Sequence, residues 1–538
     1  MTTQDPADPS GEIMQPNVPA SAAGSTFSVR FWLLVVATGI GAGLGADALM
    51  ALLHSVQHIF YDYRNGPFQA AVDRTSALHR VEVLAGAGVF AGLSWMVLRR
   101  VTHSHGTSLS EAIWEKQGKM PYLENIANAV LEMVAVGLGA PLGREGAPKD
   151  AGGALASKLS DWARLSRSDR RLLVAFGAGA GMAAVYNVPL GGALFSLEVL
   201  LGTLSLPLVL PALATSFIAT AVSWVALPST TTYAVAPLHL SDVQIVWALI
   251  CGPIVGISAI LYLRLISLAK MRKPQGWRLL AALTITFTCV GLVAIAYPQI
   301  LGNGKDVAGL AFAGKLTVPI LAGVLVLKPL ATSASLRSGA VGGLFTPSLN
   351  AGAMVGGLLG FAWLQVFPGS SVGVFAILGS AGFLAAVMQG PLSALVLVME
   401  LTGQGLPIMV PLLIVVTGAT LTSRALDDRS IYSAPLRKHG SFQPSVHAPG
   451  WPKRKRAISD RKLPGSADYT STELRATPTS PAQYHTGDAH LDANEPGATP
   501  AAQGSTPATP DGALLVRLWG LARGVLSKLN SLRRTGER

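Results

Sequence analysis

An arginine and a glutamate stand side by side in a glycine-rich stretch of this 538-residue sequence. The stretch, residues 137–153, reads GLGAPLGREGAPKDAGG and separates two apolar segments. The pair is Arg144 and Glu145. An ionisable side chain at membrane depth costs on the order of 3 kcal/mol on insertion scales, so it is a functional candidate by default. We therefore expect a functional role for Glu145; the alternative is a simple ion pair with Arg144 in a loop.

The chemistry that this stretch favours is anion binding at the start of a helix. A helix start leaves about four backbone N–H groups unpaired and carries about half a positive charge. Glycines such as Gly143 and Gly146 let those groups approach an ion, so an anion binds without a full countercharge. The sequence predicts an anion site formed by Gly143, Arg144 and Gly146. The Glu145 carboxylate would compete with the anion there and leave when it is protonated.

Two other breaks between apolar segments carry polar groups that suit an anion. In the sequence GGLFTP, the N–H groups of Leu344 and Phe345, next to Gly343, can point at an ion, and a plain turn is the alternative. Residues 106–111 read GTSLSE, where the Thr107 hydroxyl can donate to an anion. A simple N-cap box is the alternative for this third break.

The elements that must position these residues are membrane segments. Apolar residues make up 50% of the chain and charged residues only 13%, against roughly 25% in a typical soluble domain. This composition excludes a disordered chain, an ordinary soluble enzyme and a nucleic-acid-binding domain, despite the net charge of +12. The sequence has no HExxH motif. We therefore expect no enzymatic activity, no cofactor and no metal site.

The apolar segments are of two kinds, which differ in length. Long segments predict full membrane spans at residues 31–59, 83–98, 206–227, 243–266 and 279–296. Shorter segments, interrupted by glycine and proline, predict partly spanning helices at residues 129–141, 172–185, 190–201, 320–330, 351–363, 374–387, 392–399 and 408–421. Irregular backbone at membrane depth is tolerated only where it faces protein or a watery cavity, so these breaks indicate a transport path.

The sequence also contains an internal repeat. Residues 177–198 and 379–400 match at an offset of 202 with seven identities, including a Pro-Leu pair and a glutamate eight positions after its leucine. At an offset of 200, the break at Gly143 lies upstream of the first copy and the break at Gly343 upstream of the second. Each half thus contains a broken helix followed by a packed pair of apolar segments. This organisation is typical of transporters that are built from repeats and have their binding site near the middle of the membrane.

Charge and composition divide the chain into four regions. Residues 1–28 predict a flexible leader, residues 29–437 a membrane domain and residues 438–512 a disordered linker rich in Pro, Thr, Ala and Ser. Residues 513–535 predict a basic amphipathic helix with Trp519, which rests either on an anionic membrane surface or on the protein itself.

Lys and Arg gather at the ends of the apolar segments, which is typical of a multi-pass protein of the cell membrane. The main clusters lie at residues 99–100, 164–171, 270–278 and 453–456. Because cytoplasmic loops hold the excess of positive charge, and the last cluster closely follows the last span, we expect both termini to be cytoplasmic. Nucleic-acid binding by residues 453–456 is the rival interpretation, but no recognition motif surrounds them.

Six ordered motifs in this chain resemble those of the CLC chloride channel and chloride/proton exchanger family. The matches are GREG at 143–146, GLFTP at 343–347, GTSLSE at 106–111, SIYS at 430–433, NVPL at 187–190 and GPL at 390–392. Of these, GREG and GLFTP match closely, whereas GTSLSE is a degraded form of GSGIPE. The resemblance covers about residues 30–437, in the right order and spacing.

The resemblance implies an all-α polytopic membrane protein, built of inverted repeats of broken and tilted helices. It also implies a homodimer with one pore in each subunit and chloride as the transported ion. Carried over by position, Thr107 and Tyr432 would bind the central anion through their hydroxyls. Backbone amides at Leu344 and Phe345 would complete that site, and Glu145 would be the outer gate.

The chain departs from the family pattern at three places. Thr107 replaces a serine but keeps the hydroxyl, and Ala147 and Ser110 replace prolines at helix starts. In proton-coupled members a glutamate usually follows the one at Glu198, where it relays protons; here Val199 stands in that place, as in members that work as channels.

Because Val199 stands where proton-coupled members have their proton relay, we predict a gated chloride channel with passive flux. A coupled chloride/proton antiporter of the same family is the alternative, because Glu145 is retained. The antiporter needs another inner proton route, through Glu111, Glu198 or water.

Overall fold

Capping residues and apolar runs set where the helices of this chain begin. In the computed structural model, the described residues are 27–102, 106–238, 242–269, 273–427 and 429–432. Ser28 begins the first helix, since its side chain accepts a hydrogen bond from the Phe31 N–H at 3.2 Å. Ser166 caps the seventh helix in the same way, through the Asp169 N–H at 3.0 Å.

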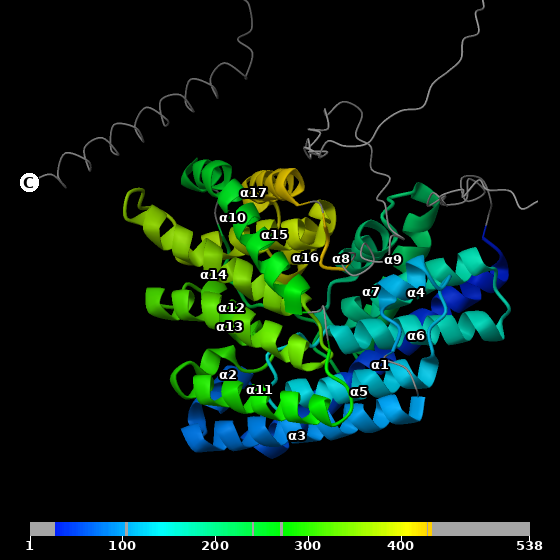
Figure 1. Cartoon of the computed structure of the whole chain (residues 1–538). Coiled ribbons are helices and arrows are strands. Elements are labelled where there is room, and N and C mark those ends of the chain that lie inside the picture. Colours follow the sequence, from blue (N-terminus) through cyan, green and yellow to red (C-terminus); the bar gives the residue numbers. More distant parts are fainter. Residues whose placement is uncertain (1–26, 103–105, 239–241, 270–272, 428, 433–538) are drawn as a thin grey trace, which may run out of the picture. The chain divides into compact units, whose positions relative to one another are not determined.

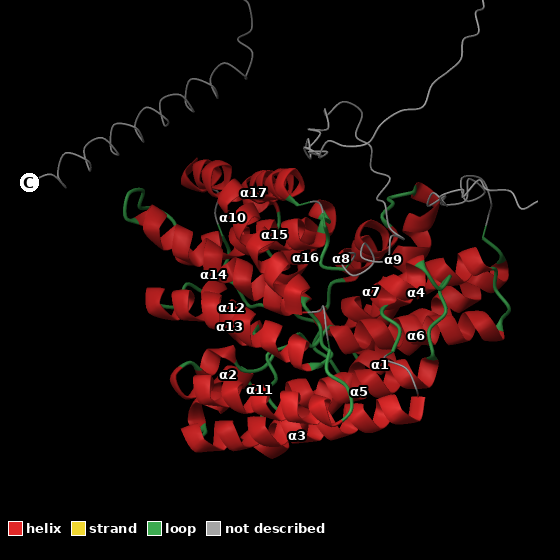
Figure 2. Cartoon of the chain, in the orientation of Figure 1, coloured by secondary structure: helices red, strands yellow, loops and turns green. Residues whose placement is uncertain are grey.

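The described residues are almost entirely helical and contain no β-strand (Figure 2). The first half comprises α1 (Val29–Tyr61), α2 (Phe68–Arg74), α3 (Ala77–Thr102), α4 (Leu109–Trp114), α5 (Tyr122–Gly137), α6 (Gly146–Trp162), α7 (Arg167–Tyr186), α8 (Pro189–Leu194), the π-helical η2 (Phe195–Leu201) and α9 (Leu206–Ser223). The second half comprises α10 (Asp242–Ala269), α11 (Trp277–Ala296), the 3₁₀ turn η3 (Pro298–Ile300), α12 (Lys305–Phe312), α13 (Val318–Ser338), α14 (Phe345–Leu364), α15 (Val372–Met388), α16 (Pro391–Thr402) and α17 (Leu406–Leu426).

Seven of the described helices are long and apolar enough to cross a membrane, namely α1, α3, α9, α10, α11, α13 and α17. Their outward faces carry large apolar side chains: Leu210 on α9 and Leu261 on α10 expose 63% and 62% of their surface. Such faces are unfavourable in water and suit the hydrocarbon of a bilayer. The five long apolar segments of the sequence correspond to α1, α3, α9, α10 and α11.

Two segments that the sequence predicts as short are full-length helices, which corrects that prediction. Residues 320–330 belong to the 21-residue α13, and residues 408–421 to the 21-residue α17, and both helices are long and apolar enough to cross a membrane. Pro329 and Pro411 lie inside α13 and α17 without ending them. Proline removes only one backbone hydrogen bond, and neighbouring groups in a membrane bundle compensate for the loss.

The internal repeat appears in the structure as two matched helix pairs. The pair α7 and α8 packs together, as does the pair α15 and α16 (Figure 1). Each first helix ends on a left-handed residue: Asn187 has φ 55° and Gln389, 202 positions later, has φ 59°. Proline then begins each second helix. The helix breaks therefore recur with the same geometry in both halves.

A pair of glutamates joins the two repeats by capping each other's short helices. The Glu400 carboxylate accepts hydrogen bonds from the N–H groups of Leu190 and Gly191 at 3.0 and 2.7 Å, at the start of α8. The Glu198 carboxylate likewise accepts from the Leu392 N–H at 3.2 Å, at the start of α16. Carboxylates are favourable at helix starts because unpaired N–H groups and the helix dipole face them.

Three regions predicted from the sequence lie wholly or almost wholly outside the described residues. These are the leader at residues 1–28, the linker at 438–512 and the amphipathic helix at 513–535. The described part of the membrane domain starts at residue 27 and ends at residue 432.

Candidate functional site

Two glycine-rich loops, one from each half of the chain, meet where α6 and α14 begin. The Gly143 N–H donates to the Gly343 carbonyl at 2.8 Å, and the Gly343 N–H donates to the Gly143 carbonyl at 3.1 Å. This isolated antiparallel bridge holds the two helix starts side by side. Two of the three predicted breaks therefore lie side by side, and the positive ends of both helices converge there.

Glu145 lies at the centre of this site and is completely buried, with 0% exposure. One carboxylate oxygen accepts from the Phe345 N–H at 2.6 Å. The other accepts from the Thr346 hydroxyl at 2.9 Å and from the Tyr186 hydroxyl at 3.2 Å. Hydrogen bonds to a charged group each contribute about 1.5–3 kcal/mol. The carboxylate thus lies at the start of α14, surrounded by one N–H group and two hydroxyl groups.

The two bridging glycines leave room for this carboxylate. A Cβ atom at Gly143 or at Gly343 would collide with Glu145 Oε1. Leu344, buried, is the N-cap residue of α14, and Gly146 is the first residue of α6. The small-residue pattern around both breaks is therefore explained by the space that the Glu145 side chain needs.

Arg144 is not the ionic partner of Glu145. Its guanidinium lies over the Tyr186 ring, 5.0 Å from the ring centroid. No ion pair within 4.0 Å among the described residues involves either Arg144 or Glu145. The structure therefore excludes the alternative of a simple Arg144–Glu145 ion pair. The Arg144 guanidinium thus contacts the ring of Tyr186, and the hydroxyl of the same tyrosine contacts Glu145.

A second buried carboxylate, Glu132 on α5, was not singled out by the sequence analysis. Glu132 Oε1 accepts from the Ala147 N–H at 3.0 Å and from the Gly343 N–H at 3.1 Å. It therefore fastens the start of α6 to the loop before α14. The signal was available in the sequence, because Glu132 is an ionisable residue inside an apolar segment, the criterion that selected Glu145.

Tyr432 contacts Lys149, which follows Glu145 by four residues on α6. Its hydroxyl accepts from Lys149 Nζ at 3.3 Å, and its ring packs edge-on against Phe195 with centroids 5.4 Å apart. Residues 430–432 form a turn that returns to the end of α15, where the Ile431 N–H donates to the Val387 carbonyl at 2.9 Å. The residues from 433 onward lie outside the described part of the chain.

Thr107 is buried before α4, but it contacts neither Glu145 nor Tyr432 through a hydrogen bond. Its Oγ1 accepts from Lys116 Nζ at 3.0 Å, and Lys116 pairs with Glu111 at 2.8 Å. The N-cap of α4 is Ser108, whose side chain accepts from the Glu111 N–H at 3.3 Å. The alternative of a simple N-cap is therefore correct for Ser108. The Thr107 hydroxyl is not the cap of α4 and instead contacts Lys116.

The position that Val199 fills lies in η2, beside the start of α16. Val199 is half-buried, and one of its methyl groups faces the Gly390 backbone. The neighbouring Glu198 accepts from the Ser393 N–H and hydroxyl at 2.6 and 2.7 Å, so its carboxylate serves as a helix cap.

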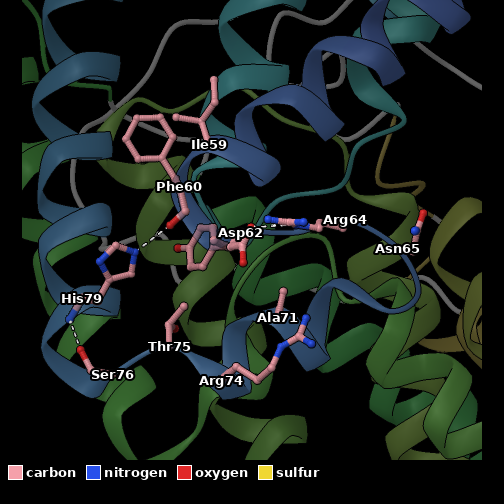
Figure 3. A pocket seen from close by; sticks show the side chains of 11 residues that line it. Ile59, Phe60, Asp62, Arg64, Asn65, Ala71, Arg74, Thr75, Ser76 and His79 are labelled. Carbon is pink, nitrogen blue, oxygen red and sulfur yellow. Dashed lines mark hydrogen bonds and ion pairs between the residues drawn. The ribbon is translucent and has the colours of Figure 1, made fainter.

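A surface pocket lies at the end of α1 (Figure 3). It is lined by residues of α1, α2, α3 and the loops that join them, including Arg64, Arg74 and His79. The His79 ring contacts the Phe60 carbonyl at 2.7 Å across this pocket. None of the residues that the sequence predicts for anion binding lines it.

Known proteins share this arrangement over most of the chain. A family model described as "Voltage gated chloride channel" matches residues 87–424. The chain belongs to the CLC family. The "Voltage-gated ClC-type chloride channel ClcB" of Salmonella typhimurium (strain LT2) is 30% identical, with 76% of this chain and 100% of that protein covered. The protein of the same name from Escherichia coli (strain SMS-3-5) is also 30% identical, with the same coverage.

Solved CLC structures have the same fold. A "slow cyanobacterial Cl-/H+ antiporter" is similar with a TM-score of 0.68 and 20% identity, covering 78% of this chain and 100% of the other. A "CLC-type fluoride/proton antiporter" is similar with a TM-score of 0.60 and 20% identity, covering 76% of this chain and 99% of the other. The chain is thus a multi-pass membrane protein of a family that transports anions, with the helical CLC fold predicted from its motifs.

Proposed function

We propose that this chain carries chloride across a membrane along a path that Glu145 opens and closes. The observation that carries the proposal is the set of donors around the Glu145 carboxylate, namely the Phe345 N–H and the hydroxyls of Thr346 and Tyr186. These neutral donors suit any compact anion. The same site therefore serves the carboxylate when the path is closed and chloride when it is open.

Protonation of Glu145 is the event that opens the path. A neutral carboxyl group gives up most of the charge-assisted part of its hydrogen bonds, which makes release of the side chain easier. A chloride ion then accepts from the freed Phe345 N–H and from the N–H groups of Leu344 and Gly146 near the paired helix starts. Gly143 and Gly343 hold these starts together, Arg144 adds positive charge, and no cofactor takes part.

We propose coupled chloride/proton exchange as the mode of transport, ahead of the passive flux expected from the sequence. Competition between the anion and the Glu145 carboxylate for one set of donors links anion binding to protonation by a reciprocal free energy. The similar solved structures of chloride/proton and fluoride/proton antiporters agree with this mode. Passive flux remains the second candidate, because Val199 cannot carry a proton and the similar curated proteins are named as channels.

The proton route away from Glu145 is assigned to Glu111. Of the two carboxylates considered from the sequence, Glu198 is occupied as the cap of α16. Glu111 instead pairs with Lys116, which donates to Thr107, and about a third of its side chain is exposed. A proton entering at Glu111 thus reaches the neighbourhood of Thr107, from where water would carry it.

Purified protein in liposomes tests the function and its mode together. A chloride gradient is imposed, and chloride efflux and proton movement are recorded with an ion electrode and a pH-sensitive dye. We expect chloride to drive protons uphill in a fixed ratio, and Glu111→Gln to reduce that proton movement. Chloride flux without uphill proton movement would establish the passive mode, and absence of chloride flux would contradict the proposal as a whole.

We further propose that the protein functions as a homodimer in the cell membrane with both termini in the cytoplasm. The orientation follows from the basic clusters at the ends of α3 and α6, since positive charge is retained in the cytoplasm. Light scattering of the detergent-solubilised protein measures the subunit number, and a monomer mass would contradict the dimer.

A further inference from the structure

Lys149 is a buried cation to which the gating mechanism assigns no role. Its side chain is on α6, four residues after Glu145, and the residue is only 4% exposed. Its one side-chain hydrogen bond is the donation from Nζ to the Tyr432 hydroxyl at 3.3 Å. Nζ also lies over the rings of Tyr432 and Phe195, 4.9 and 5.4 Å from their centroids. Among the described residues, no carboxylate forms an ion pair with it.

The position of Lys149 on α6 makes an unpaired positive charge unfavourable. It is the fourth residue of the helix, within the first turn, where the helix dipole is positive. Burial removes the water that would otherwise stabilise the ammonium group. Aromatic faces attract the cation but do not neutralise it. Glu145 and Asp150 act on Lys149 electrostatically, but neither lies within ion-pair distance of the ammonium group, so the position suits a mobile anion.

The hydrogen bond to Tyr432 leaves donors free for such an anion. An ammonium group has three N–H donors, and only one of them is used in this contact. Because the tyrosine oxygen accepts from Lys149, its own O–H is directed elsewhere and remains able to donate. A compact anion between the two side chains would accept from both an N–H and an O–H group.

The site lies along one face of α6, in line with the gate. Residues four apart on a helix share a face and are separated by roughly 6 Å along the axis, so Lys149 follows Glu145 on that face. One further turn along, a Cβ at Gly153 would meet the side chain of Leu109, at the start of α4. The same helix face thus leads from the gate to the helix start that Thr107 precedes.

We propose that the Lys149 ammonium is a fixed cationic ligand of the transported anion, which it holds together with the Tyr432 hydroxyl. This inference rests on the proposed anion transport. It adds one charged ligand, the Lys149 ammonium, to the neutral N–H and O–H donors of the proposed path. A chloride held there interacts with a full positive charge rather than with dipoles alone. Lys149 therefore sets how tightly the anion is bound between Glu145 and Thr107, and it binds the anion whether or not the gate is protonated.

Charge removal at Lys149 tests this proposal in the full-length protein. Lys149→Met keeps the length and removes the charge, whereas Lys149→Arg keeps the charge at every accessible pH. Lys158→Met removes an exposed charge from the same helix and is the matched control. Chloride is titrated calorimetrically into each purified protein in chloride-free buffer, and thermal unfolding and liposome chloride flux are measured in parallel.

We expect Lys149→Met to weaken chloride binding about 10-fold or more, the loss typical of a charge-assisted hydrogen bond. Lys149→Arg should stay within a few-fold of wild type, and Lys158→Met should match wild type. If Lys149→Met is not folded, Lys149→Gln is used in the same titration. Unchanged chloride affinity in a folded, charge-free variant would overturn the inference while leaving transport by the wild type intact. Absence of chloride flux in the wild type would instead refute the proposed function.

Discussion

At the scale of single residues, the Glu145 carboxylate is held by hydroxyl groups that lie outside the glutamate-bearing motif. The Thr346 and Tyr186 hydroxyls both lie within hydrogen-bond distance of the same Glu145 oxygen, and they also form a hydrogen bond with each other, in which either can be the donor. No cation lies within ion-pair distance of the carboxylate among the described residues. The position of the carboxylate therefore depends on these neutral donors and on the Phe345 N–H.

Removing one of the two hydroxyls should favour the open state. Thr346→Val keeps the side-chain shape and deletes the donor, which weakens the closed gate by about 1.5–3 kcal/mol, or roughly 10- to 100-fold in the opening equilibrium. We expect chloride efflux from liposomes at neutral pH to rise, and Tyr186→Phe to act in the same direction. Efflux at or below the wild-type rate in both variants would show that these hydroxyls do not hold the gate.

Glu132 should affect stability rather than gating. Glu132→Gln removes the charge that the N–H groups of Ala147 and Gly343 now face, so we expect a loss of about 1–3 kcal/mol in unfolding free energy. Thermal unfolding in detergent measures this loss. The pH dependence of chloride flux should remain as in the wild type, because Glu145 is unchanged. A shifted pH profile would instead make Glu132 part of the gate.

The sequence predicted part of this site, and long-range contacts explain the rest. Glu145, Phe345 and the two glycine breaks stood out because charge and glycine in apolar surroundings are local signals. Tyr186 did not, because its hydroxyl reaches Glu145 only after α7 packs along α6. Lys149 lay within the quoted stretch, but its burial beside Tyr432 joins residues 283 positions apart.

At the scale of elements, the two repeats are joined by mutual capping. Glu198 caps α16 and Glu400 caps α8, at positions 202 residues apart. Helix capping therefore explains why each copy of the repeat carries this glutamate. Because Glu198 serves as a cap, we do not place it in the proton route that was one of its possible roles from the sequence.

Neutralising either capping glutamate should have matching effects on stability. Glu198→Gln and Glu400→Gln each remove a negative charge from a helix start, and we expect a loss of about 1–2 kcal/mol for each. Thermal unfolding of the two variants in detergent provides the comparison. If Glu198→Gln abolished proton movement without lowering stability, a relay role for Glu198 would replace the capping role.

Helix breaks in this chain were predictable where glycine accompanied them and less so where proline stood alone. The breaks before α6 and α14 contain glycines that make room for a carboxylate. By contrast, Pro329 and Pro411 remain inside α13 and α17, because the surrounding bundle tolerates one missing hydrogen bond. The position of a proline in the sequence therefore does not tell whether the helix ends there or continues through it.

At the scale of the whole membrane domain, both ends of the described chain lie on one side. The Phe60–His79 contact places the end of α1 beside the start of α3, so the start of α1 and Arg99 lie at the opposite side. Arg99 donates to the Gly339 carbonyl at 3.0 Å, just after α13.

Further arginines extend this side to the end of the last described helix. Arg337, at the end of α13, donates to the Leu268 carbonyl at 3.4 Å near the end of α10. Arg264, also near the end of α10, lies 3.9 Å from Asp427 after α17. Arginines thus gather on the side where α1 starts and α17 ends.

This distribution predicts the orientation of the protein in the membrane. A green fluorescent protein fused to the C-terminus should fluoresce in bacterial cells, and alkaline phosphatase fused at the same place should be inactive, because both report a cytoplasmic location. A dark fluorescent fusion together with an active phosphatase fusion would reverse the orientation.

We propose that one carboxylate, Glu145, both occupies an anion position and controls access to it. Chloride efflux from liposomes is measured between acidic and alkaline pH for wild type and Glu145→Gln, with proton movement recorded alongside. In the wild type, efflux should rise as pH falls and Glu145 becomes protonated. Glu145→Gln mimics the protonated side chain, so its efflux should be high at every pH and uncoupled from protons. A Glu145→Gln variant that kept the wild-type pH dependence would contradict the account.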